Sequence, residues 1–221
     1  INPLSTIFTE GRLHIPDTNE LFDYLNSLEL NKEVTDNHDL DMFFHEETLN
    51  EILNLRNYIL KKEKNNDLNH LDRWIRMVAT NRLTGHSKGF FSVYTMPPNQ
   101  AVSRERQMKI NEKKQQKPEY KNTKEIIFKK SKSLLRDINQ KDISNLKNAY
   151  TESIFINNDA SQTNEIENNQ VKLIITSPPF LDIVQYSKDN WLRLWFNGID
   201  FEQLDKKITM SKTLADWSSK M

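Results

Sequence analysis

The sequence predicts an α/β fold in which a long helical segment precedes the strands. Apolar residues recur with helical spacing in several segments before residue 150, and two short apolar runs ended by turns follow them, in "SIFINNDA" and "VKLIITSPPF". A short apolar run that ends in a turn is typical of a buried parallel strand. The order strand, connection, strand and helix favours an α/β arrangement with ligands at the carboxyl ends of the strands.

The helical segments come first in the chain. "TNELFDYLNSLEL" begins with a partial capping box at Thr18, and "HEETLNEILNLRNYILKKEK" has acidic residues in its first turn and lysines in its last. "DLNHLDRWIRMVATNRL" repeats the apolar spacing. We expect these three stretches to be amphipathic helices packed on one another. Further helices are predicted in "SRERQMKINEKKQQ", "YKNTKEIIFKKSKSLLRDI" and "DIVQYSKDNWLRLWF".

A stretch rich in glycine and aromatic residues, "LTGHSKGFFSVYTMPPNQAVS", interrupts the helical pattern. It predicts an ordered loop that could include a short strand at "FFSVY". Two interpretations of Phe90, Phe91 and Tyr94 stay open: the loop forms a functional lid, or the three rings fill part of the core.

The formal net charge of zero conceals a basic middle region. Residues 101–150 hold 14 Lys and Arg against 6 Asp and Glu, whereas residues 1–70 hold 6 against 14. A basic region in a neutral chain is compatible with a polyanion that is contacted locally. The alternative is a solvated helix surface in a lysine-rich sequence.

Several classes of protein and of site are not expected. The sequence has no apolar run of about 18 residues and therefore predicts no membrane span. "INPLSTIFTE" lacks the basic and apolar regions of a signal peptide, so we expect a cytoplasmic protein. Without cysteine there is no disulfide framework, and the histidines have no metal-site spacing, so no metal is expected. The histidines, interpreted as surface and cap residues, are His14, His38, His45, His70 and His86.

Directly after the second predicted strand lies Ser177-Pro178-Pro179-Phe180. This tetrapeptide resembles the (D/N/S)-P-P-(Y/F/W) motif of the amino-group DNA methyltransferases, which transfer a methyl group from S-adenosylmethionine to the exocyclic nitrogen of cytosine or adenine. The resemblance implies that the Ser177 side chain and the Pro178 carbonyl accept the amino hydrogens and localise the nitrogen lone pair. Pro178 and Pro179 would fix that carbonyl, and Phe180 would stack on a base flipped out of the duplex. Serine at the first position favours cytosine over adenine.

Two further segments resemble parts of the same family. "IFINNDA" is similar to the segment that ends the third strand of the S-adenosylmethionine fold, which implies that Asp159 meets the cofactor adenine and Ala160 offers a backbone amide. "INPLS" resembles the tail of the second-strand segment G-x-D-x-N-P-L, which implies that Ile1 lies against the adenine and Asn2 begins the next helix. The family's F-x-G-x-G loop has no counterpart, because no two of the four glycines form G-x-G.

The resemblance implies a partial Rossmann-like class I methyltransferase sheet interrupted by a long, mainly helical insertion. Residues 1–11 would be a remnant of the cofactor-binding half, residues 12–150 the DNA target-recognition insertion, and residues 151–221 the catalytic half. Either a second polypeptide supplies the missing loop, or the chain is a fragment whose gene is split or decayed, and we expect the isolated chain to be inactive. Double-stranded DNA would be contacted through its phosphates by six residues of the insertion: Arg73, Arg76, Arg82, Lys88, Arg104 and Arg106.

Two other hypotheses remain open. The chain could be a catalytically inactive, DNA-binding remnant of such an enzyme. It could also be a structural helical protein in which S-P-P-F occurs by chance.

Overall fold

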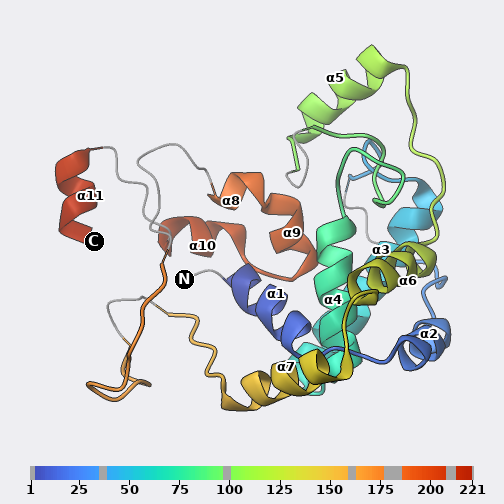
Figure 1. Ribbon diagram of the computed structural model, residues 1–221. Helices are drawn as coiled ribbons and strands as arrows, with labels where there is room; N and C mark the ends of the chain where they lie inside the picture. Colours follow the sequence, from blue (N-terminus) through green and yellow to red (C-terminus); the bar gives the residue numbers. More distant parts are fainter. Residues whose placement is uncertain are drawn as a thin grey trace.

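The computed structural model describes residues 3–34, 39–96, 101–158, 163–176, 186–207 and 213–220. Within these ranges the chain forms helices joined by loops (Figure 1). The helices are α1 (Pro3–Leu13), α2 (Thr18–Ser27), α3 (Glu46–Lys64), α4 (His70–Arg82), α5 (Arg104–Lys114), α6 (Thr123–Leu135), α7 (Gln140–Glu152), α8 (Tyr186–Asp189), α9 (Trp191–Phe196), α10 (Phe201–Lys207) and α11 (Leu214–Lys220). None of the helices in these ranges is long and apolar enough to cross a membrane.

The predicted α/β fold with a Rossmann-like sheet is wrong for the described chain. Its residues form no β-strand, and the ladder geometry is limited to one isolated bridge between Gly85 and Tyr94. The two apolar runs that were predicted as buried strands are irregular and are not buried: Ile154, Leu173 and Ile175 are 70%, 74% and 88% accessible, and Phe155 and Ile156 are partly buried. A strand needs a neighbouring strand for its hydrogen bonds, and neither run finds one among the described residues.

The five helices predicted from apolar spacing before residue 150 are confirmed as α2 to α6, the helix that the resemblance implied at the start of the sequence is present as α1, and α7 is added to them. Short polar side chains cap several of them. Asp17, one residue before the predicted cap, accepts hydrogen bonds from the backbone of Asn19 and Glu20 at the start of α2. Asn69 and Asp72 form a complete capping box at the start of α4. These caps satisfy backbone N–H groups that a helix cannot pair internally.

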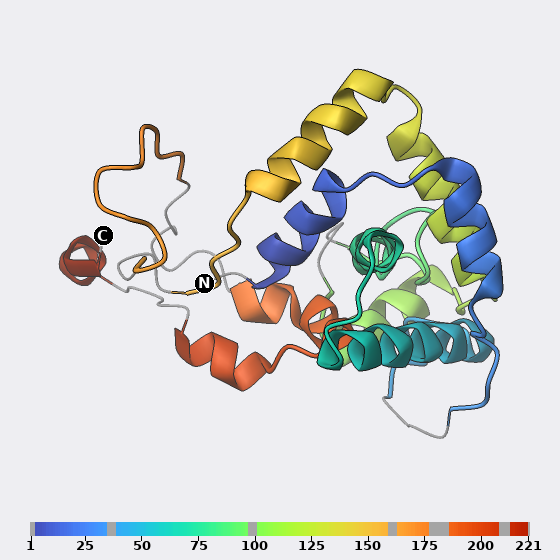
Figure 2. The same cartoon turned by 90° about the horizontal axis from the view of Figure 1, so that it is seen from below.

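Helix α4 lies at the centre of the core, and α1, α6 and α9 contact it (Figure 2). In most of its length the side chains on nearly every face are buried, among them Trp74 and Ile75. The contact with α1 is close, because a Cβ atom added at Gly11 would lie 2.6 Å from the Met77 Cβ and 3.0 Å from the Arg73 carbonyl oxygen. A larger residue at position 11 would therefore push α1 away from α4.

A buried carboxylate joins α2, α3 and α4. The Asp72 side chain is fully inaccessible; its Oδ1 accepts from the hydroxyls of Tyr24 at 2.7 Å and Tyr58 at 3.0 Å, and its Oδ2 accepts from the Lys62 ammonium at 2.9 Å. Burial and the hydrogen bond shared with the Tyr24 hydroxyl raise the pKa of Tyr58. Because every acceptor position of the carboxylate is used, this network is a structural one.

The aromatic loop after α4 fills part of the core. Phe90 and Phe91 are buried, which confirms the second interpretation for these two rings, whereas Tyr94 is partly buried beneath the Lys114 ammonium at 4.1 Å. Backbone hydrogen bonds close the loop: Phe91 donates to Arg82 at 2.8 Å, and Thr95 donates to Gly85 at 3.0 Å. The part of the loop that the structure describes before residue 97 is therefore packed against the core.

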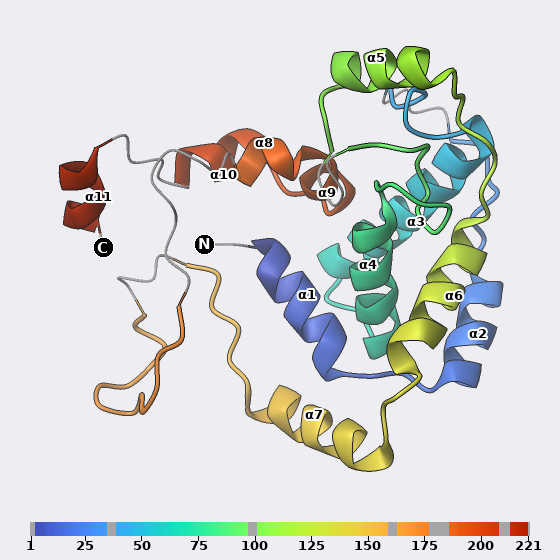
Figure 3. The same ribbon diagram turned by 45° about the horizontal axis from the view of Figure 1, so that its top comes forward.

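The described stretches between α7 and α8 lie apart from the packed helices. Figures 1 and 3 show these two stretches, 153–158 and 163–176, extending on the side of the molecule where α11 lies. Helices α8, α9 and α10 return to the body, and α9 packs against α4. The residues that follow the predicted catalytic motif are thereby brought onto the helical body.

Candidate nucleic-acid interface

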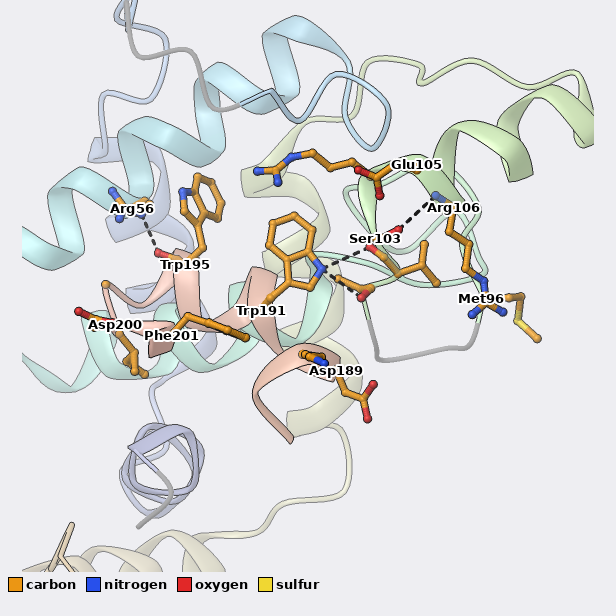
Figure 4. Close-up of a pocket in the computed structure, with 16 residues that line it drawn as sticks. Arg56, Met96, Ser103, Glu105, Arg106, Asp189, Trp191, Trp195, Asp200 and Phe201 are labelled. Atoms are coloured by element: carbon orange, nitrogen blue, oxygen red, sulfur yellow. Dashed lines mark hydrogen bonds between the residues drawn. The ribbon is translucent and has the colours of Figure 1, made fainter. Parts of the chain in front are cut away.

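An open cleft of about 1270 Å³ separates the start of α5 from α8, α9 and the start of α10 (Figure 4). One wall consists of residues 101–106, which are the end of the aromatic loop and the first turn of α5, and the other of side chains from residues 188 to 201. Its volume exceeds the roughly 300–1,000 Å³ that is common for small-molecule sites. The cleft therefore has room for a segment of a larger ligand.

Two tryptophans of α9 form the apolar floor of the cleft. Trp191 and Trp195 are four positions apart and lie on the same face of α9, while Leu192, Leu194 and Phe196 are buried. The indole nitrogen of Trp191 donates to the carbonyl oxygens of residues 101 and 102, at 3.1 and 3.3 Å. These hydrogen bonds fix the ring and tie the two walls together.

An arginine lies over each tryptophan ring. The guanidinium carbon of Arg104 is 5.0 Å from the ring centre of Trp191, and that of Arg56 is 5.2 Å from the ring centre of Trp195. Arg56 also donates through Nε to the Trp195 carbonyl oxygen at 2.9 Å, and Arg104 donates to the Asp39 carbonyl oxygen at 3.0 Å. Such stacking fixes the orientation of a guanidinium group.

The start of α5 adds polar groups to the same wall. Ser103 is the N-cap and accepts a hydrogen bond from the backbone of Arg106 at 3.3 Å. The Ser103 hydroxyl also holds the pKa of Glu105 below its usual value. Across the cleft, the backbone N–H of Gln203 lowers the pKa of Asp200 in the same way. Both carboxylates are therefore ionised at neutral pH, so an anion would be favoured at the arginines and disfavoured beside Glu105 and Asp200.

Of the six residues predicted to contact DNA, Arg104 and Arg106 line the cleft. Arg76 does not fit the prediction, because its side chain is 5% exposed and bound to the Glu63 carboxylate at 2.6 and 3.0 Å and to the Asn197 side chain at 2.7 Å. This arrangement leaves no surface for a phosphate, and the residue ties α3, α4 and α9 together.

The remaining predicted DNA contacts are dispersed. Arg73 is an ion-pair partner of Glu10 at 3.6 Å and donates to the Leu68 carbonyl, so it joins α4 to α1. Lys88 is exposed in the aromatic loop. Arg82 lies against the ring of Phe90, with its guanidinium carbon 4.0 Å from the ring centre. None of these three lines the cleft.

The predicted catalytic and cofactor residues lie outside the described residues. These are Ser177, Pro178, Pro179 and Phe180 of the motif, and Ile1, Asn2, Asp159 and Ala160 of the expected cofactor pocket. The described chain resumes at Tyr186, six positions after Phe180, and enters the cleft wall at Lys188. No group of three His, Asp or Glu side chains in the described ranges is arranged to hold a metal ion.

Three residues of the cleft were not predicted as functional from the sequence. Trp191 and Trp195 belong to the predicted helix in "DIVQYSKDNWLRLWF", where no functional role is expected for them, and Arg56 lies in a predicted amphipathic helix without a functional signal. Both tryptophans are half-buried and pack against the core as well as lining the cleft. Arg56 reaches Trp195 across 139 positions of sequence, and no local pattern indicates such a contact.

Comparison with known proteins gave no match: none to a family model, none to a curated protein and none to a solved structure.

Proposed function

We propose that this chain is the DNA-binding and motif-carrying part of an S-adenosylmethionine-dependent methyltransferase acting on the exocyclic amino group of cytosine or adenine. In this proposal double-stranded DNA occupies the cleft. Ser177 and Pro178 accept the hydrogens of the target amine, and Phe180 stacks on the flipped base.

One observation carries the proposal. The cleft brings the start of the basic segment, Arg104 and Arg106, opposite the helices that follow the S-P-P-F motif. Six residues span at most about 20 Å when fully extended, so Phe180 lies within that distance of Tyr186 at the base of α8. A duplex held at the cleft by its phosphates would therefore have its bases within reach of the motif.

The character of the cleft also supports a nucleic-acid ligand. Arginines and the start of a helix are the groups that contact phosphates, and these contacts position a duplex without reading its sequence. The tryptophan rings offer flat apolar surface beside the charged groups, as at sites where bases stack. Asp200 on the opposite wall and Glu105 on α5 would restrict the phosphates to the neighbourhood of Arg104 and Arg106.

The cofactor requires a separate source in this proposal. The sequence has no glycine-rich loop of the F-x-G-x-G kind, so a second polypeptide would supply the main S-adenosylmethionine contacts. Asp159 would contribute to that pocket from this chain. The alternative function is DNA binding without methyl transfer, and it uses the same cleft.

Fluorescence anisotropy with a labelled duplex tests the DNA-binding step. We expect the wild-type chain to bind duplex DNA with an affinity that falls as salt rises, and we expect the double variant Arg104→Ala/Arg106→Ala to bind at least about tenfold more weakly, because two phosphate contacts are lost. The matched control is Lys109→Ala/Lys113→Ala, which removes the same charge from α5 outside the cleft.

Equal weakening by the two double variants would contradict the proposal, since binding would then depend on net charge alone. Arg104 packs on Trp191, so the single variant Arg106→Ala, at an exposed position, provides a second test with less effect on the fold. Methyl transfer in the presence of a cofactor-binding partner, abolished by Ser177→Ala with DNA affinity unchanged, would separate the enzyme from the DNA-binding alternative.

A further inference from the structure

Four aromatic rings form a row at the junction of α1, α4 and α7. The ring of His14, in the loop after α1, stacks on the ring of His70, the first residue of α4, with the ring centres 4.7 Å apart and the planes inclined at 23°. The centre of the same His14 ring lies 5.6 Å from that of Tyr150, near the end of α7. Tyr150 lies in turn 6.1 Å from Phe155, in the stretch that follows α7. The row therefore connects the start of α4 to residues 153–158.

Helix α7 is held to the body by little buried surface. It packs along α1 (Figure 2), and several of its side chains are half-buried but none is fully buried. The half-buried Tyr150 gives α7 its contact with the ring of His14. Elements with few buried apolar contacts are the ones that open first in a folded protein. A small change at the ring row can therefore decide whether α7 stays docked.

Positive charge gathers around His14. Burial, and then the positive charges of His70, Lys147 and Arg73, lower the pKa of His14 below its ordinary value. His70 and Arg73 belong to α4, and Lys147 belongs to α7. A proton on His14 would consequently place like charges on both α4 and α7.

The nearby carboxylates pair with the neighbours of His14. The Glu20 carboxylate of α2 lies 3.4 Å from the Nε2 of His70, and the Glu10 carboxylate of α1 lies 3.6 Å from the Nε of Arg73. Glu20 favours a charge on His14, but its effect is smaller than that of any of the three cations. A protonated His14 is therefore repelled more strongly than it is attracted.

We propose that protonation of His14 releases α7 from α1 and α4. The neutral ring stacks in the row, whereas a charged ring faces Lys147 across the contact, and the tilted ring of Tyr150 attracts a cation only weakly. The undocked state binds a proton at the ordinary histidine pKa of about 6.5 and the docked state at a lower one. The stability that neutral His14 gives to docked α7 is therefore complete above about pH 6.5, and it is lost as pH falls toward the lower pKa. Release of α7 requires neither DNA nor a cofactor.

Hydrogen exchange followed by mass spectrometry measures the docking of α7. After correction for the intrinsic exchange rate, we expect the protection of α7 relative to that of α3 to fall at least about threefold between about pH 7.5 and pH 5. In His14→Phe, which keeps a ring but cannot take up a proton, this ratio should not change with pH. The matched control is His86→Phe, at an exposed histidine of the aromatic loop, which should behave as the wild-type chain does.

A ratio that is independent of pH in the wild-type chain, or an unchanged fall in His14→Phe, would overturn the proposal. If His14→Phe does not fold, Lys147→Gln provides the test at an exposed position, because it removes one of the positive charges around His14. We expect it to reduce the fall, whereas Lys141→Gln, which removes the same charge from the first turn of α7, should leave the fall as in the wild type. An equal fall in the two lysine variants would count against the proposal just as strongly.

The titration of His14 gives an independent check by NMR. The imidazole resonances of His14 should titrate below the ordinary pKa of about 6.5 in the wild-type chain and closer to it in Lys147→Gln. A pKa of His14 at or above the ordinary value would overturn the proposal, because protonation would then not oppose docking.

Discussion

The same kind of apolar side chain is buried in the helical body formed by α1 to α9 but exposed in the segment 153–176. Leu192 and Leu194 in α9 are fully inaccessible, whereas Leu173 and Ile174 are 74% and 78% exposed. Both pairs belong to short apolar runs near aromatic or proline residues. An apolar run therefore does not determine its own burial, which depends on whether its backbone can pair locally.

Hydrogen bonding explains the difference. A helix satisfies its backbone groups within one segment and needs neighbours only for its apolar face, while a strand needs a second strand for both. Within the described part of 153–176, the backbone hydrogen bonds between residues are local turns, from Ile166 to Thr163 at 3.1 Å and from Gln170 to Glu167 at 3.4 Å. The apolar run 171–175 consequently stays in solvent.

Replacing one leucine by alanine in each region is expected to give the largest difference in the free energy of unfolding. Leu55 is fully inaccessible in α3, and Leu55→Ala should lower the free energy of unfolding by about 2–5 kcal/mol through lost burial and a residual cavity. Leu173→Ala should change it by less than about 0.5 kcal/mol. Denaturant unfolding followed by circular dichroism measures both. A comparable cost for the two variants would show that segment 153–176 is packed in solution.

A smaller effect is expected at alkaline pH, where α6 meets α3. The Tyr120 hydroxyl donates to the Glu51 carboxylate at 2.7 Å, and this hydrogen bond raises the pKa of Tyr120 to about 12. The folded pKa lies above the unfolded one of about 10, so the stability contributed by this tyrosine is complete below pH 10 and is lost as pH rises through 12.

Spectrophotometric titration of the wild-type chain and of Tyr120→Phe measures the pKa of the Tyr120 hydroxyl, as the difference between the two titration curves. In Glu51→Gln the carboxylate is replaced by a neutral amide, and the pKa of Tyr120 should move back toward 10. A pKa near 10 in the wild-type chain would contradict the hydrogen bond. The side chain is 45% exposed, so solvent limits its contribution to stability.

Much of the helical body could be predicted from the sequence, because amphipathic spacing and capping residues are local signals. The stretches that became α3 and α4 have both, and their ends agree with the pattern. The sheet prediction was wrong because the period and composition of a sequence identify an apolar run but do not show whether the folded chain supplies a partner strand for it.

The candidate site was predictable only in part. Charge pointed to Arg104 and Arg106, which do line the cleft, and also to Arg76, whose partner Asn197 is 121 positions away. Whether an arginine faces solvent or a buried polar partner depends on such distant contacts. The tryptophans of α9 were visible in the sequence, but their position at a cleft edge depends on Arg56 and on the 101–106 wall.

The central claim is that the S-P-P-F motif and the arginine cleft act on the same duplex. The chain contains no cysteine, so Phe180→Cys introduces a single thiol that can form a disulfide with a duplex carrying a thiol-tethered cytosine. We predict efficient cross-linking that Arg104→Ala/Arg106→Ala reduces at least about tenfold, in line with the lost phosphate contacts. Ile154→Cys, at a 70% exposed position, serves as the control for random encounter. Cross-linking at position 180 that equals the control, or that persists without the two arginines, would contradict the claim.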